Sequence, residues 1–396
     1  MVAVLLERLA TRIVTEVPKD SPDGTRPPAG AVLAVHMPTG DHLGTAGHRT
    51  LTPRAPMTPD TVHDLASVTK VVATTLAIMR LVSDGALDLE ARVSSFLPRF
   101  TGSRKDDVTI RDLLLHRGGM QEWWPLYIAA PQATGQPEAA LDVVDRLPLR
   151  YAPNEGHHYS DLGFIQLGRI VAVITGEPLP RAVRTLVLDP LGLDTISYEP
   201  PASCPVSASA SDDHVEIEMI DSGVPYAVPY TSADFPRWRR AMIVGQVHDG
   251  NAFHALGGTA GHAGLFGTVP DLLGVATALA RYRQHEEIWR PAIAEEFFAA
   301  HCDAHQALGF RRYPLQIGGR RVDALGHTGF VGAAMAFIPG TEVAVALGTN
   351  RLLRGGRPVP TELMLRELLC AATSPAAGHP TSPDTAHPPD TNRGTS

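Results

Sequence analysis

The chain has 396 residues, of which 44% are hydrophobic and 19% charged, and its formal net charge is −8. This composition predicts a soluble globular protein with room for two cores, and the absence of a basic block argues against nucleic acid as a partner. Three widely spaced cysteines without a C-x-x-C pair argue against a disulfide framework and a zinc ribbon and fit a reducing cytoplasm. The first ten residues carry no basic leader, and no apolar run has the length needed to cross a bilayer. We therefore expect a cytoplasmic location and no membrane partner.

The N-terminal part of the chain predicts a hairpin followed by helices. Two apolar runs flank the turn Pro38-Thr39-Gly40-Asp41, which is typical of a β-hairpin. Apolar residues then recur at helical spacing behind Asp64, until Asp84-Gly85 ends the helix. The predicted elements are, in chain order, a helix over 2–17, strands over 30–36 and 42–46, a helix over about 65–84, and helices over 108–116, 138–147 and 162–175.

The C-terminal part predicts mainly strands. Residues 200–235 have weak periodicity, and we predict no element there. A glycine-rich turn over 257–264 precedes a short strand and a helix that begins near Asp271. The remaining predicted elements are strands over 324–327, 333–338 and 343–349, a helix over 361–372, and a disordered tail rich in Pro, Thr and Ser from 374 onward.

Strands at both ends of the chain around a helical middle predict a domain that is interrupted by an inserted one. We expect a discontinuous sheet domain formed by residues 1–62 and 245–372. Residues 63–244 would form a mainly helical domain, and residues 373–396 a disordered tail.

Ser67 and Lys70 are the first candidates for chemistry. Their spacing places both side chains on one face of the first helical turn. The helix offers Lys70 no carboxylate at i+3 or i+4, so we expect partial desolvation to lower its pKa. A serine hydroxyl beside a lysine that loses its proton is a nucleophile with its base. Lys70 is one of only three lysines in the chain, and arginine cannot act as such a base.

Two later motifs allow both a catalytic and a structural interpretation. Tyr159-Ser160-Asp161 opens a helix, where the tyrosine either exchanges protons with a hydroxyl or only packs the loop, and Ser160 or Asp161 caps the helix. His327-Thr328-Gly329 ends a strand, where His327 either faces a substrate carbonyl or carboxylate or lies before a surface bulge. Gly329 would let substrate approach the strand edge, and the N–H groups of Ser67 and Phe330 would form an oxyanion hole.

The remaining polar and aromatic clusters are less specific. Trp123 and Trp124 either anchor a packed loop or line the substrate pocket. The histidines at 248, 254 and 262 match no compact ligand spacing, so we expect no metal. A metal hydrolase built on these histidines is the alternative.

The order Ser67-Val-Thr-Lys70, Tyr159-Ser-Asp161, His327-Thr-Gly329 resembles that of the penicillin-recognising serine enzymes, which include class C β-lactamases, D-alanyl-D-alanine peptidases and β-lactamase-like esterases and acyltransferases. The resemblance covers about residues 31–350. It is supported by Leu65-Ala-Ser-Val-Thr-Lys70, Thr109-Ile-Arg-Asp-Leu-Leu-Leu-His116, Tyr159-Ser-Asp-Leu-Gly-Phe164, Asp189-Pro-Leu-Gly-Leu193 and Gly261-His-Ala-Gly-Leu-Phe266.

The resemblance implies an α+β fold, with an antiparallel sheet flanked by helices and an inserted helical domain. It also implies that Ser67 is acylated, that Lys70 is its base and that Tyr159 shares their proton network. Asp161 would bind substrate where β-lactamases usually have asparagine. His327 stands where they usually have lysine, which weakens a fixed positive anchor; both departures occur among the esterase-like relatives.

The sequence therefore predicts a serine acyl-transfer enzyme that needs no cofactor and hydrolyses a small ester or amide. One alternative is a transacylase that passes the acyl group to a second small molecule, an amine or alcohol, in a secondary-metabolite pathway such as antibiotic biosynthesis. A non-catalytic binding relative is the other alternative.

Overall fold

A seven-stranded antiparallel sheet forms one side of the molecule in the computed structural model, which describes residues 2–19, 21–130, 137–301 and 303–374. The sheet order is β4-β3-β2-β12-β11-β10-β9. Its strands are β2(Gly30–Met37), β3(Gly40–Leu51), β4(Arg54–Pro56), β9(Arg311–Ile317), β10(Arg320–Thr328), β11(Ala334–Phe337) and β12(Ala344–Thr349).

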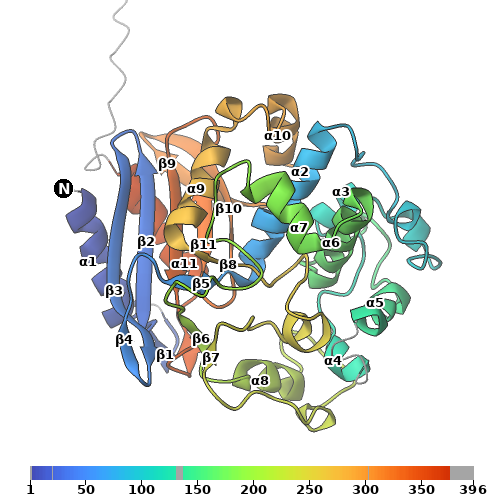
Figure 1. Cartoon of the computed structure of the whole chain (residues 1–396), viewed down its shortest axis with the longest axis horizontal. Coiled ribbons are helices and arrows are strands. Elements are labelled where there is room, and N and C mark those ends of the chain that lie inside the picture. The colour runs from blue at the N-terminus through green and yellow to red at the C-terminus, as the bar shows by residue number, and fades with distance from the viewer. Residues whose placement is uncertain (1, 20, 131–136, 302, 375–396) are drawn as a thin grey trace, which may run out of the picture.

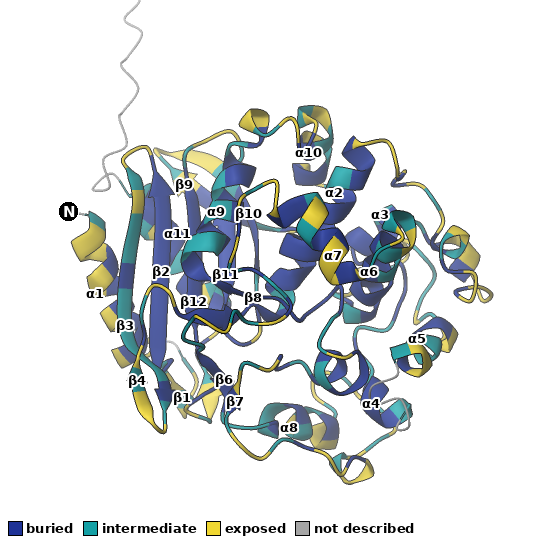
Figure 2. Ribbon diagram, viewed as in Figure 1, coloured by how far each residue is buried: buried dark blue, intermediate teal, exposed yellow. Residues whose placement is uncertain are grey.

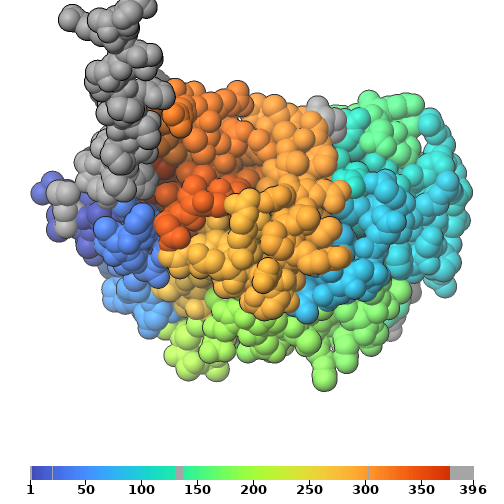
Figure 3. Space-filling model, turned by 90° about the horizontal axis from the view of Figure 1, so that it is seen from above, coloured from blue at the N-terminus to red at the C-terminus, as the bar shows by residue number. Residues whose placement is uncertain are grey.

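The two ends of the chain meet in the middle of this sheet. Strand β2 pairs with β12 in antiparallel register, with Leu33 opposite Leu347. Every residue of β2 is buried, because the sheet is covered on both faces: α1(Val2–Thr15) and α11(Thr361–Thr373) pack on one, and α9(Val269–Ala280) packs on the other. Seen from above, the blue N-terminal segment lies against the orange and red C-terminal segments (Figure 3).

The other side of the molecule is mainly helical, as Figure 1 shows. These helices bury a continuous apolar core that extends to the sheet, and Figure 2 shows their exposed residues on the outer surface. The remaining helices are α3(Ile110–Leu114), α4(Leu126–Ala129), α5(Pro137–Arg146), α6(Asp161–Thr175), α7(Leu179–Val183), α8(His214–Ser222) and α10(Pro291–Phe298). The short strands are β1(Thr25–Arg26), β5(Val62–Asp64), β6(Ala208–Ala210), β7(Ile243–Val244), β8(Phe266–Thr268) and β13(Arg357–Pro358).

The central helix runs from Ala66 to Ser83 and changes its pitch twice. It begins with a 3-10 turn, η1(Ala66–Val68), widens into a π-helical segment, η2(Lys70–Thr75), and continues as α2(Leu76–Ser83). Its length and apolar composition would suffice to cross a membrane, contrary to the expectation from the sequence. However, 89% of this stretch is buried inside the protein, which identifies it as a core helix.

Most predicted elements are confirmed. The structure has the hairpin, the helices near residues 2–17, 138–147 and 162–175, and the C-terminal strands. The fold is α+β with an antiparallel sheet flanked by helices, as the resemblance implied. The region 200–235 contains β6 and α8, which the sequence analysis did not predict. The domain boundaries stay a prediction, and the proposed tail lies, apart from Thr373 and Ser374, outside the described residues.

Helix α6 packs against the segment that follows the glycine-rich turn through two glycines. A Cβ at Gly168 would lie 2.7 Å from Gly261 Cα, and a Cβ at Gly261 would lie 2.2 Å from the carbonyl oxygen of Phe164. Such approaches exclude any side chain at either position. The contact fixes α6, whose first residue is Asp161, against the central helix and its neighbours.

We predict that Gly168→Ala lowers the free energy of unfolding by about 1–3 kcal/mol, because the added methyl group forces backbones apart. Gly163→Ala in the same helix is the matched control. Its Cβ would have only ordinary contacts, the nearest at 3.7 Å, so the higher helix propensity of alanine should leave stability unchanged or raised. Urea denaturation of both variants measures the difference, and equal stabilities would contradict the close packing.

Candidate active site

Ser67 and Lys70 lie at the start of the central helix, as their spacing predicts. The Lys70 Nζ donates a hydrogen bond to Ser67 Oγ at 3.0 Å and to the carbonyl oxygen of His262 at 3.2 Å. The Lys70 side chain is fully buried, whereas Ser67 is partly exposed. The partly exposed Ser67 hydroxyl is therefore in contact with the buried Lys70 amine.

The prediction of a lowered pKa for Lys70 is wrong. Burial alone would lower it, but Asp161 Oδ1 lies 2.7 Å from Nζ, and its charge together with Tyr159 raises the pKa of Lys70 above its ordinary value. The carboxylate comes from the first residue of α6 and not from the helix that carries Lys70. In the resting structure Lys70 is thus an ammonium ion in a buried ion pair.

Tyr159 lies beside this ion pair. Its ring centroid is 4.8 Å from Lys70 Nζ, and its phenol lies close enough to Lys70 and Ser67 that both groups act to lower its pKa. Burial raises the pKa of the phenol, although the Lys70 charge acts in the opposite direction. The phenol therefore holds its proton and contacts both partners. Ser160 accepts a hydrogen bond from Gly163 N and is the N-cap of α6, as predicted.

His327 is not the titratable group that we expected, because it is buried. It is buried, its Nδ1 donates to the carbonyl oxygen of Thr328 at 2.8 Å, and its ring packs on Tyr159 with centroids 5.8 Å apart. Burial, helped by the charges of Arg311 and Lys70, holds its pKa well below the usual range. His327 is therefore a neutral packing partner of Tyr159 and not a titratable anchor for substrate.

His116 is a residue that sequence reasoning missed. Its ring lies 4.6 Å from that of Tyr159, and its Nδ1 accepts a hydrogen bond from Ser160 N at 3.0 Å. Burial and the Lys70 charge lower its pKa well below the usual range. Tyr159 thus contacts two uncharged imidazoles, His116 and His327. The signals in the sequence were its position at the end of a helix before two glycines and its place in the segment 109–116 that supports the resemblance.

The residues after Gly261 run alongside the central helix and fix its start. Thr74 Oγ1 donates to the carbonyl oxygen of Gly261 at 2.6 Å, and Leu265 N donates to Thr69 Oγ1 at 3.1 Å. The Leu65 N–H also donates to the carbonyl oxygen of Leu265 at 2.9 Å. These hydrogen bonds hold the carbonyl group that accepts from Lys70.

Asp64 holds the backbone before the nucleophile. Its Oδ1 accepts from Ala66 N at 2.8 Å and its Oδ2 from His248 N at 2.7 Å. Ala66 has a φ of 45°, a conformation that a non-glycine residue rarely adopts. Burial raises the pKa of Asp64 to about 6. One carboxyl group therefore joins the strained turn before Ser67 to the next loop of the site.

Gly329 packs against the turn before Ser67, and the approach of substrate to the strand edge at this residue stays a prediction. A Cβ at this position would lie 2.5 Å from the Leu65 carbonyl oxygen and 3.3 Å from Ala66 Cβ. The end of β10 thus lies directly against the turn before Ser67. Phe330, the next residue, is 48% exposed. The oxyanion hole formed by the N–H groups of Ser67 and Phe330 stays a prediction.

Ser67 opens into a cavity of about 740 Å³. Trp123 lines it and stacks on Tyr226 with centroids 6.2 Å apart. Trp124 is not among the lining residues; it packs edge-on against Tyr230. The remaining described residues of the lining are Ala66, Tyr159, Asp161, Val215, Glu216, Glu218, Met219, Ser222, Val224, Pro225, His248, Asp249, Ala263, Arg311, Phe330 and Val331.

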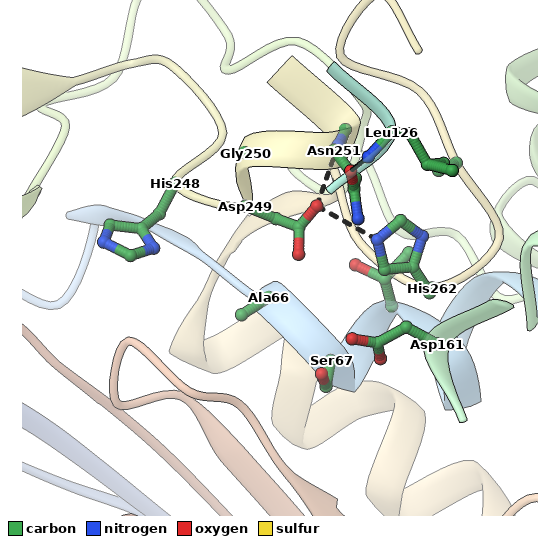
Figure 4. A network of polar contacts seen from close by, with 12 residues as sticks. Ala66, Ser67, Leu126, Asp161, His248, Asp249, Gly250, Asn251 and His262 are labelled. Atoms are coloured by element: carbon green, nitrogen blue, oxygen red, sulfur yellow. Dashed lines mark hydrogen bonds and ion pairs between the residues drawn. The ribbon is translucent and has the colours of Figure 1, made fainter. Parts of the chain in front are cut away.

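Arg311 and the residues of α8 are parts of this cavity that the sequence did not indicate. The Arg311 guanidinium lies 5.2 Å from the centroid of the Tyr159 ring. Arg311 is opposite Gly326 in the β9–β10 pair, so it supplies a positive charge near the position where β-lactamases usually have lysine. Only the strand register reveals this. Asp249, which also lines the cavity, accepts from His262 Nε2 at 3.0 Å (Figure 4).

Within the described ranges, no three His, Cys, Asp or Glu side chains are grouped so that they could hold a metal ion. The alternative of a metal hydrolase built on His248, His254 and His262 therefore lacks a ligand set in this part of the chain.

Comparisons with known proteins agree with this geometry. A family model described as Beta-lactamase matches residues 24–368. The N-acetylmuramyl-L-alanine amidase of Bacillus subtilis (strain 168) is 31% identical over 324 residues, which are 75% of this chain and 69% of that protein. A putative D-alanyl-D-alanine carboxypeptidase of Escherichia coli (strain K12) is 34% identical over 224 residues, which are 54% of this chain and 50% of that protein. The structure of EstCE1, described as a hydrolase with promiscuous acyltransferase activity, superposes with a TM-score of 0.66 at 20% identity and covers 94% of this chain and 98% of that one.

We predict that Asp161→Asn reverses the direction of the Lys70 pKa shift, because it removes the raising charge and leaves the lowering burial. In the wild type the pKa of Lys70 is higher in the folded state than in the unfolded state. The stabilisation by its ion pair with Asp161 therefore persists at neutral pH and is lost only as the pH rises through the folded-state pKa. In the variant the folded-state pKa lies below the unfolded one, so stability should increase with pH on the alkaline side.

At neutral pH the same substitution should cost about 3–5 kcal/mol of unfolding free energy, since it leaves a buried ammonium unpaired. Denaturant unfolding across the pH range measures both effects. Asp84→Asn, which breaks the exposed ion pair with Arg80, is the matched control and should cost no more than about 1 kcal/mol. A flat pH dependence in Asp161→Asn would contradict the assigned charge state.

Proposed function

The chain belongs to the beta-lactamase family, and from this premise we propose that it hydrolyses a small ester or amide through an acyl-enzyme on Ser67. The family assignment confirms the resemblance found in the sequence and identifies the protein as a serine hydrolase. One observation above all supports the specific proposal. Ser67 Oγ lies 3.0 Å from the buried Lys70 Nζ, at the surface of the large cavity.

Acylation begins with a proton shift inside the ion pair. Lys70 passes one proton to Asp161, 2.7 Å away, which leaves a neutral amine next to an uncharged carboxyl group. As Ser67 Oγ forms its bond to the carbonyl carbon, its proton moves to Lys70. When the bond to the leaving group breaks, Tyr159 donates a proton to the leaving group and regains one from Lys70. Total charge in the site stays constant throughout.

Deacylation uses the same groups in the opposite order. Water adds to the acyl carbon and gives a proton to the Tyr159 and Lys70 pair, and Ser67 Oγ leaves and takes that proton back. In both steps the N–H groups of Ser67 and Phe330 would stabilise the negative charge on the carbonyl oxygen. Arg311 lies where it can bind an anionic group of the substrate.

We expect an activated ester such as p-nitrophenyl acetate to leave an acetyl group on Ser67, detectable by mass spectrometry of the quenched protein. Ser67→Ala should give no adduct and lower the hydrolysis rate by ~10⁴-fold or more. Lys70→Arg, which keeps the charge and cannot act as a base, should lower the rate to a similar degree. An adduct on another residue, or near-native turnover by Lys70→Arg, would overturn the assignment.

Transfer of the acyl group to an amine or alcohol is the second candidate reaction. Two observations favour it: the cavity of about 740 Å³ is large enough for an acyl donor and a small acceptor, and EstCE1 is described as having promiscuous acyltransferase activity. In this reaction the acceptor replaces water and gives its proton to the same two groups. A role in a secondary-metabolite pathway belongs to this candidate.

We predict that the acyl-enzyme partitions toward a small amine when that amine is added at increasing concentration. Product analysis by mass spectrometry measures amide against acid formed from one ester donor. Saturation of the ratio would indicate a bound acceptor and favour the transferase, whereas a ratio that rises linearly would indicate trapping from solution and favour the hydrolase. The reaction without enzyme is the control.

We also propose that the protein works in a reducing, cytoplasmic compartment. Among the described residues, Cys204 and Cys370 carry free thiols, which is the usual state in such an environment. Fractionation of the producing cells tests this. We expect the enzyme in the cytoplasmic fraction, and its detection in the exported fraction would contradict the proposal.

A further inference from the structure

The wall of the cavity formed by α8 contains a buried carboxyl group that forms no ion pair with any described residue. Glu216 lines the cavity. Its Oε1 accepts a hydrogen bond from the Tyr127 hydroxyl at 2.7 Å, and its Oε2 accepts from Gly250 N at 3.1 Å. Both partners are uncharged. Among the described residues no arginine, lysine or histidine forms an ion pair with Glu216, whereas the nearby Asp213 pairs with Arg239.

The turn at Gly250 places a second carboxylate, that of Asp249, in the lining of the same cavity. A Cβ at Gly250 would lie 2.3 Å from Glu216 Oε1, so only glycine lets the turn lie directly over this carboxyl group. The residue before it, Asp249, also lines the cavity, and its Oδ1 is held by Ala252 N at 2.8 Å and His262 Nε2 at 3.0 Å. Figure 4 shows Asp249 and Asp161 grouped around Ser67 and His262.

The two carboxyl groups influence each other. Burial raises the pKa of Glu216 to about 8, and the charge of Asp249 is the next cause. Asp249 itself has a lowered pKa, because His262 and other partners outweigh its burial. A positive charge placed between them would offset the repulsion and favour ionised Glu216. Asp249 already has His262 beside it, so Glu216 is the one of the two carboxyl groups that lacks an ion-pair partner among the described residues.

A separate observation also indicates a ligand in this cavity, at the part of its lining where His248 packs beside Phe330. His248 lines the same cavity with a buried side chain, and its Nε2 has no hydrogen-bond partner among the described residues. Burial lowers the pKa of His248 to about 4, so its ring is neutral and able to accept a hydrogen bond. Trp123 and Tyr226 add ring faces, which attract cations.

We propose that Glu216 and Asp249 form a subsite for a primary ammonium group on the acyl part of the substrate. The acyl part remains bound while the leaving group departs, so it is the part that reaches this enclosed wall. The inference rests on the proposed function, and it defines the substrate class as esters or amides of amino acids with a free amino group. The carboxylates neutralise the ammonium, and the Lys70 and Asp161 ion pair is left intact for chemistry.

Alaninamide and isobutyramide test the subsite because they have the same shape and differ in one ammonium group. Binding of each to the Ser67→Ala protein is measured by calorimetry, with both enantiomers of alaninamide. We expect one enantiomer of alaninamide to bind about tenfold tighter than isobutyramide, or more. In the Glu216→Gln, Ser67→Ala double variant the ratio should fall close to one.

Glu286→Gln in the same background is the matched control, because it removes an equal charge from an exposed glutamate that does not line the cavity. The preference for alaninamide should persist there. Equal affinities for the two amides in Ser67→Ala would overturn the subsite, whether or not the Glu216 variant folds. That outcome is distinct from failure of the proposed function, which would be the absence of an adduct on Ser67.

Discussion

The buried ion pair between Lys70 and Asp161 is the constraint on which the site depends. Taking an ammonium ion out of water is costly, and only a carboxylate at hydrogen-bond distance and well-placed acceptors compensate for it. The fold supplies these from three places in the chain: the central helix, the start of α6, and the segment after Gly261. The glycine contact between Gly168 and Gly261 and the threonine hydrogen bonds of the central helix hold these three together.

This ion pair also determines how the site manages charge. Three of the groups beside it are uncharged: His116 and His327 have lowered pKa values and Tyr159 a raised one. A proton can therefore move between Lys70 and Asp161 without creating a new net charge in a region of low dielectric. An asparagine at position 161 would leave the ammonium without its counter-charge, and the lysine would then be neutral more readily. With aspartate at position 161 the lysine becomes neutral by passing a proton to the carboxylate, and with asparagine it becomes neutral because its pKa is lower.

The sequence predicted what depends on local spacing and failed where a distant contact decides. Ser67 and Lys70 are three residues apart, so one helical turn brings them together, and the hairpin and long helices follow from periodicity. The Lys70 pKa depends on Asp161, 91 residues later in the chain, which no local pattern reveals. His327 was expected to titrate because the pairing of its strand, and thus its burial, was unknown. Helix α8 was missed because its polar sequence has weak periodicity. The burial of Glu216 in this helix depends on Tyr127 and Gly250, which are distant in the sequence.

The two sides of the cavity have different structural support. One side carries the catalytic residues, and the other side determines which substrate fits. Ser67, Lys70 and Tyr159 are held by the core helix, by α6 and by the end of β10, where a single methyl group would collide with backbone. The opposite wall, with Glu216, Met219 and Tyr226, comes from α8 and the loop after it, and hydrogen bonds from Tyr127 and Gly250 to Glu216 join it to the rest. Substitutions on that wall alter the shape and charge offered to the acyl group without disturbing the ion pair. The same catalytic groups can therefore serve different substrates, which explains why the motifs identify the family with certainty while the substrate must be inferred from the cavity wall.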